Sequence, residues 1–237
     1  MTRARSRGFT LMELMIVVML VAILAMIAAP SMSTARNDRI AFDYARQTSG
    51  IFHEGRARAA GRGGAHLALF TTAAAIGTRG AIFLFEGLDG TAPPAGPSPI
   101  ASCRSATQWN WAATYVPGVA PDATNRARLI EFLNINATAT GTVQVSEDIF
   151  MRGFTVTDAG AKAPVTAIAV CTTPNGTTYV GTGATGAAAI TAMTTATPFT
   201  GIAEVDVARH RSGGLVVAGL TRRVMLAGAG APRILSQ

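Results

Sequence analysis

One apolar run near the N-terminus constrains the fold of this sequence more than any other feature. Between Phe9 and Ala29 only Thr10 and Glu13 are polar. A helix of this length, rising about 1.5 Å per residue, just spans a bilayer core about 30 Å thick. The basic residues of the preceding segment 1–8 hold that end of a membrane helix in the cytoplasm. The pattern predicts a transmembrane helix at 9–29, with the rest of the chain carried across the membrane.

A secretory signal that is cleaved after the apolar run would have the same basic start. Two features argue against it. The small residues 28–29 that could form its cleavage site are followed by Pro30, which is a poor context for cleavage, and Glu13 interrupts the apolar region. We therefore expect the helix to stay attached to the rest of the chain.

Glu13 needs a physical reason to lie in this run. A carboxylate near the start of a membrane helix costs on the order of a few kcal/mol unless it is paired or protonated. A cut between Gly8 and Phe9 would create an α-amino group four residues before Glu13, positively charged at neutral pH. Glu13 is expected either to lie at the membrane interface or to attract the new N-terminus of a neighbouring subunit.

The sequence Gly8-Phe9-Thr-Leu-Met-Glu13-Leu, its short basic leader and Pro30 together resemble the class III signal of type IV pilins and type II secretion pseudopilins. The resemblance covers about the first thirty residues. It implies that a prepilin peptidase cuts after Gly8 and methylates Phe9. It also implies that Glu13 neutralises a neighbour's N-terminus during assembly, and that Pro30, which lacks an amide donor, bends or locally melts the helix.

Residues 30–61 are predicted to continue this helix as an amphipathic stem. Ile40, Tyr44, Thr48, Ile51 and Phe52 recur at helical spacing and form one apolar face. The glycine-rich segment 61–64 ends it. We interpret the charged residues on the other faces as solvated: Arg36, Asp38, Arg39, Asp43, Arg46, Glu54, Arg56 and Arg58.

Residues 65–237 are predicted to form a β-rich head, because short apolar or β-branched runs alternate there with turn residues. The expected strands are 66–70, 81–85, 109–115, 142–145, 167–172, 177–180, 202–207, 215–218 and 221–226; the segment 128–135 could be a strand or a short helix. Segments 87–99 and 182–200 are expected to be exposed loops. The predicted fold class is α+β: a long N-terminal helix packed on a mainly antiparallel head.

Cys103 and Cys171 lie far apart, with no other cysteine or histidine at metal-ligand spacing, which argues against a metal centre. In a head outside the cytoplasm they could form a disulfide or remain as two buried thiols. No cofactor is expected.

Catalytic patterns are absent from the sequence. The three histidines lie in different segments, and neither a nucleophile elbow nor a phosphate loop occurs. Glu204 and Asp206 would point to the same side of a strand, but two such carboxylates more often mark a solvated edge than an acid–base pair. We expect a structural protein, not an enzyme.

The net charge of +7 falls to +4 when the three leader arginines are removed, so basicity alone does not indicate a nucleic-acid partner. The stem end 54–62 and the segment 219–226 loosely resemble the GspH/FimT subgroup, in which some FimT-like subunits hold DNA. Arg222 and Arg223 would face opposite sides of a strand, while Arg209 and Arg211 could enlarge a basic patch. We favour ordinary surface arginines over DNA contacts.

The sequence as a whole predicts a minor pilin or pseudopilin that initiates or caps a type IV pilus or a type II secretion pseudopilus. The alternative is a FimT-like, DNA-binding minor pilin. The expected partners are a prepilin peptidase, other pilins through the N-terminal helix, and the inner membrane. The leader, residues 1–8, would lie in the cytoplasm and the head in the periplasm, before the subunit enters a filament.

Overall fold

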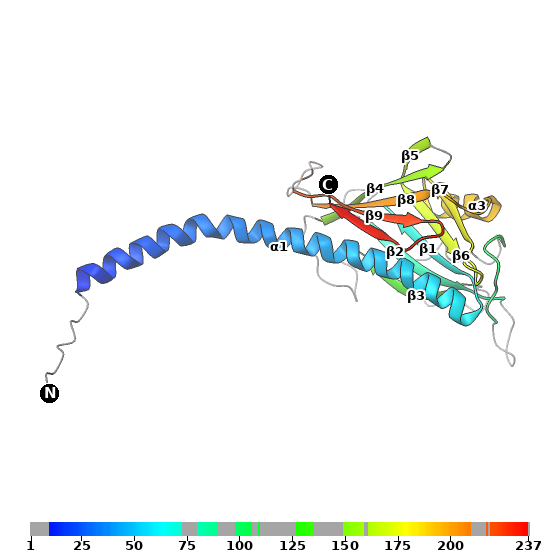
Figure 1. Cartoon of the computed structure of the whole chain (residues 1–237), viewed down its shortest axis with the longest axis horizontal. Coiled ribbons are helices and arrows are strands. Elements are labelled where there is room, and N and C mark those ends of the chain that lie inside the picture. The colour runs from blue at the N-terminus through cyan, green and yellow to red at the C-terminus, as the bar shows by residue number, and fades with distance from the viewer. Residues whose placement is uncertain are drawn as a thin grey trace, which may run out of the picture.

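The computed structural model describes residues 10–72, 80–89, 98–105, 109, 127–134, 149–158, 161–209, 217 and 219–236. In this part of the chain a long N-terminal helix leads into a head of two antiparallel sheets with a short helix (Figure 1). This is the predicted α+β arrangement.

Helix α1 spans Leu11–Arg62 and has a defined cap at each end. At its start the Thr10 hydroxyl accepts a hydrogen bond from the Glu13 N–H. At its end Gly63 adopts the left-handed conformation, with φ of 70°, and its N–H bonds to the Ala59 carbonyl. The glycine-rich stop predicted from the sequence is therefore a glycine C-cap.

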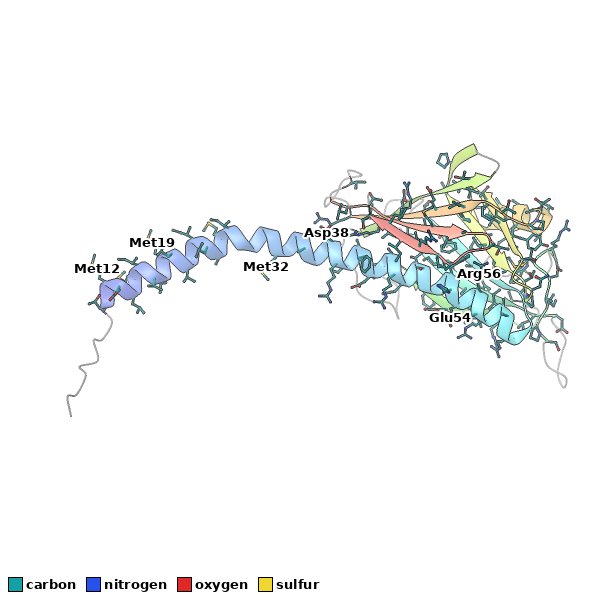
Figure 2. All side chains as sticks on the ribbon, in the orientation of Figure 1. Met12, Met19, Met32, Asp38, Glu54 and Arg56 are labelled. Carbon is teal, nitrogen blue, oxygen red and sulfur yellow. A yellow bond between two sulfur atoms is a disulfide. The ribbon has the colours of Figure 1, made fainter. Side chains whose placement is uncertain are left out.

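Pro30 lies inside α1, and the helix is continuous through it. The ribbon curves between the labelled Met19 and Met32, the interval that contains Pro30 (Figure 2). Proline removes one helical hydrogen bond and crowds the preceding turn, which is a sufficient cause of curvature. Of the two alternatives expected at Pro30, a bend or local melting, the ribbon shows a bend in a continuous helix.

The strands within the described residues form two sheets of five. Sheet 1 has the order β3-β2-β1-β6-β7 and sheet 2 the order β10-β9-β8-β4-β5, and every recorded pairing is antiparallel. The strands are β1 His66–Thr71, β2 Ala81–Gly87, β3 Ala127–Asn134, β4 Ile149–Asp158, β5 Ala161–Val165, β6 Ala167–Thr172, β7 Thr178–Gly183, β8 Ile202–Arg209, β9 Arg222–Ala227 and β10 Arg233–Ser236.

The main core lies where α1 meets both sheets. Tyr44, Ile51 and Phe52 of the predicted apolar stem face are buried there, together with Phe70 of sheet 1 and Val224 of sheet 2. Burial of such side chains contributes roughly 1.5–3 kcal/mol each relative to exposure. The second half of α1 is therefore part of the head's own core.

A second core lies on the other side of sheet 1, because successive residues of a strand face opposite ways. Leu67 and Leu69 of β1 point into it and meet α3, Gly186–Thr195. A Cβ at Gly181 would lie 2.1 Å from the Ala189 carbonyl oxygen, so only glycine allows this helix to approach β7 so closely.

The structure corrects several sequence predictions. The segment 182–200 is not an exposed loop, because it contains α3, whose Ile190 and Met193 are buried in the second core. The segment 128–135, for which the sequence allowed a strand or a short helix, forms most of β3. Trp109 is helical, whereas a strand was predicted to begin there. Strands β4, β5 and β10 were not predicted. The rest of 109–115, all of 142–145, most of 215–218 and residues 90–97 lie outside the described residues.

Candidate functional site

Glu13 lies in the first turn of α1 with its side chain exposed. Its N–H donates to the Thr10 hydroxyl oxygen at 3.2 Å, and the Thr10 hydroxyl donates to Oε2 of Glu13 at 3.4 Å. A threonine followed three residues later by a glutamate is the capping-box pattern, and the helix dipole favours a carboxylate at this end. Glu13 thus has a role within its own helix, while its exposed carboxylate stays accessible to an outside partner.

Gly8 and Phe9, the expected cleavage and methylation residues, lie outside the described part of the chain. The structure places only their neighbour Thr10. Their proposed role therefore rests on the sequence, and it stays a prediction.

The first half of α1 carries an uncovered apolar surface. Every side chain described from Leu11 to Ile27 is exposed. Met12 and Met19 stand on the part of the helix that projects beyond the head (Figure 2). An apolar surface of this extent marks a site of contact with protein or lipid. Among the residues that the structure describes, no helix qualifies as long and apolar enough to cross a membrane.

The second half of α1 is tied to sheet 2 by charged and cation–π contacts. Asp38 lies 3.6 Å from the Arg209 guanidinium, and the Arg222 guanidinium lies over the Phe42 ring at 5.6 Å. The Arg222 side chain also donates to the Ser236 hydroxyl of β10. Two of the four arginines proposed for DNA contact therefore join the stem to the head.

Arg223 faces the opposite side of β9 and binds two carboxylates of β8. Its guanidinium donates to Asp206 at 2.7 and 3.0 Å and lies 3.4 Å from Glu204. Hydrogen bonding to Asp206 raises the pKa of Arg223 above its usual value. Glu204 and Asp206 do share one side of the strand, as the sequence predicted, and they serve as the partners of this arginine. Arg211 lies outside the described residues.

Arg56 connects the stem to the turn between β9 and β10. It donates to the carbonyl oxygens of Gly230 and, at 3.0 Å, of Gly228, and its guanidinium lies 5.5 Å from the centre of the Phe52 ring. The sequence interpretation placed Arg56 on a solvated face, which is wrong. Its partners lie more than 170 residues later, and no local pattern indicates them.

A buried carboxylate lies at the other end of the junction. The Glu86 side chain is 1% exposed and forms ion pairs with Arg62 of α1, at 3.7 Å, and with Arg128 of β3. His66 lies directly opposite Glu86 in the β1–β2 pairing and has its Nδ1 3.1 Å from the Gly64 carbonyl oxygen. Burial lowers the pKa of His66 below its usual value, so the neutral ring is favoured here.

Glu54 of α1 and Glu131 of β3 form a carboxyl pair near this cluster. Glu54 also accepts a hydrogen bond from Arg58 at 2.6 Å. Hydrogen bonding to Glu131, and then to Arg58, lowers the pKa of Glu54. Burial and the bond with Glu54 raise the pKa of Glu131. The two pKa shifts have opposite directions, so Glu131 holds a proton more readily than Glu54 does.

Cys103 and Cys171 are joined in a disulfide, with a Cα–Cα distance of 5.8 Å. The bond lies in the second core and ties the segment 98–105 to β6. Among the described residues, no group of three or more acidic, histidine or cysteine side chains could hold a metal ion.

The N-terminal segment that carries Glu13 matches a known family model. Residues 3–29 match the model of the prokaryotic N-terminal methylation motif, which is typical of type IV pilin and pseudopilin precursors. The chain carries a prepilin-type methylation motif. This motif implies processing by a prepilin peptidase and assembly with other pilins. No curated protein and no solved structure matches the chain.

The prepilin motif ends at residue 29, so it covers only the start of α1 and leaves the head unassigned. The resemblance of residues 54–62 and 219–226 to the GspH/FimT subgroup has no support from the comparisons. The DNA-contact interpretation stays a prediction, and three of its four arginines, Arg209, Arg222 and Arg223, already have partners within the subunit.

Proposed function

We propose that the chain is a minor pilin or pseudopilin, a structural subunit that initiates or caps a type IV pilus or a type II secretion pseudopilus. The observation that carries this proposal is the prepilin motif on the half of α1 whose apolar side chains the head leaves uncovered. In the precursor, residues 9–29 would anchor the chain in the inner membrane, with residues 1–8 in the cytoplasm and the head in the periplasm. In the filament, the same side chains would pack among neighbouring subunits.

The first test is the N-terminus of the mature protein. Mass spectrometry should find Phe9 as an N-methylated first residue, because the motif implies cleavage after Gly8. Gly8→Leu should accumulate as an uncleaved, membrane-held precursor, because a bulky side chain obstructs the peptidase, whereas Thr10→Ser should be processed normally. A mature chain that begins at Met1, or just after Ala29, would contradict the proposal.

The second test concerns Glu13. Glu13→Ala should allow cleavage but reduce recovery of the subunit in purified filaments or pseudopilus complexes, because the cross-subunit charge pair is lost. Glu13→Gln separates the two roles of this residue: it keeps a side chain that can support the helix start but removes the charge. Equal recovery of wild type and both variants would refute the assembly role of the carboxylate.

A further inference from the structure

The end of the head farthest from the exposed stem carries a small hollow with no role in the proposed function. His66 follows the C-terminal end of α1 and pairs with Thr172, so the β6–β7 turn lies at that end of the molecule (Figure 1). The hollow has a volume of about 340 Å³ and lies between this turn and the segment 101–104. This volume is at the lower end of the range for small-molecule sites.

Both walls of the hollow are held in place by specific bonds. On one side, Cys103 is bonded to Cys171 and the Arg104 N–H donates to the Ser102 hydroxyl oxygen at 3.2 Å. On the other side, the Thr173 N–H donates to the Thr177 carbonyl at 2.9 Å. The disulfide joins the two walls directly, since Cys171 lies two residues before Thr173. Such preorganisation lowers the cost of ordering a site when a ligand binds.

The side chains that line this hollow offer donors without an acceptor. The structure records no partner for the Arg104 guanidinium, the Tyr179 hydroxyl or the Asn175 amide N–H groups within the described part of the chain, and no carboxylate is among the described lining residues. A guanidinium binds a carboxylate through paired hydrogen bonds. The Tyr179 ring and Pro174 add an apolar wall, and the Ser102 hydroxyl can bond to a ligand hydroxyl.

We propose that this hollow binds a sugar acid, with the ligand carboxylate on Arg104, ring hydroxyls on Asn175 and Ser102, and the apolar face of the sugar ring against Tyr179. A small inorganic anion would use Arg104 but not the aromatic wall, and a neutral sugar would use the wall but not Arg104. The proposal is independent of the filament role.

The test uses full-length protein in detergent, titrated with sodium galacturonate and followed by saturation-transfer NMR and calorimetry. We expect saturable binding with a Kd on the order of 1 mM, because small ligands gain little free energy per atom. Galactose and sulfate should each bind at least about tenfold more weakly than galacturonate, since each lacks one of the two interactions. Sulfate that binds as well as galacturonate, or no saturation by galacturonate up to about 50 mM, would overturn the proposal.

Variants locate the site. Arg104→Ala should weaken galacturonate binding about tenfold or more, whereas Arg233→Ala, which removes an exposed arginine of β10, should leave it unchanged. Tyr179→Leu should weaken the binding of galacturonate and of galactose alike.

Reduction of the disulfide should also weaken binding, because the two walls are then no longer joined. An unchanged unfolding temperature of Arg104→Ala would show that the fold of this variant is intact. Equal loss from Arg104→Ala and Arg233→Ala would place the binding elsewhere.

Discussion

The first and second halves of α1 share one helical geometry but have opposite surroundings. From Leu11 to Ile27 every side chain except that of Glu13 is apolar, and the side chains are exposed. From Ile40 onward an apolar stripe is buried and polar residues occupy the other faces. A helix that is apolar on every side is stable only within protein or lipid. The apolar side chains of the second half are covered by the head of the same subunit, whereas those of the first half can be covered only by another molecule. The two halves can therefore be tested separately by paired substitutions.

The largest difference in stability is expected between two isoleucine-to-alanine substitutions, one in each half of α1. Ile51→Ala should lower the free energy of unfolding of the head by about 2–5 kcal/mol, because it removes buried methylene groups from the main core and leaves a cavity. Ile23→Ala should leave head unfolding unchanged, because Ile23 is 47% exposed and precedes the part of α1 that enters the main core. Chemical denaturation of both variants in the same detergent measures the two free energies of unfolding. Similar losses of unfolding free energy in the two variants would contradict the proposed difference between the halves.

A smaller difference is expected from two arginines of the second half. Arg56→Ala should cost about 1–2 kcal/mol, because two carbonyl oxygens of the β9–β10 turn lose a charged donor and Phe52 loses its cation. Arg46→Ala should cost nothing measurable, since Arg46 is exposed. Hydrogen exchange should also show faster exchange of β10 in Arg56→Ala alone. Protection of β10 that stays at the wild-type level would mean that other contacts hold this strand.

The smallest effect is expected in the pH dependence of stability, and it arises at the junction between α1 and β3. A raised pKa of Glu131 contributes stability below its unfolded-state pKa, and this contribution is lost as pH rises through the folded-state pKa. Glu131→Gln keeps a hydrogen-bond donor to Glu54 without titrating, so it should be more stable than wild type at pH 8, with the difference shrinking toward pH 4. The effect should be small because this pair is partly solvated.

Unfolding temperatures of wild type and Glu131→Gln, measured from pH 4 to pH 8, give the comparison. A Glu131→Gln curve that is parallel to the wild-type curve would show that the titration of Glu131 does not contribute to the stability of the head.

Short-range patterns were sufficient to predict the stem, its glycine stop, its buried face and the strands with regular alternation. They failed where tertiary contacts decide the structure. The tract that forms α3 has little apolar bulk, and it is helical because Gly181 lets it lie against β7 and Met193 fills the second core. In β4 a register shift between Met151 and Gly153 breaks the alternation that would have indicated a strand.

The candidate site divides in the same way. Gly8, Phe9 and Glu13 belong to one contiguous motif and could be read directly from the sequence. The partners of Arg56 lie 172 and 174 residues away, and those of Glu86 come from α1 and β3, so these contacts exist only once the chain has folded. The charge pattern of the stem was visible, but its division into solvated and paired residues was not.

The strands that cover α1 have a consequence for how the chain is made. Val205 and Val207 of β8 and Val224 of β9 pack on the stem, yet they come far later in the chain than the stem does. A chain that emerges N-terminus first exposes the apolar stem face until these strands have followed. Such late closure slows folding and leaves apolar surface open to aggregation. A chain that stops before β8 would lack the cover for its own stem, so loss of the C-terminal strands should appear first as poor solubility.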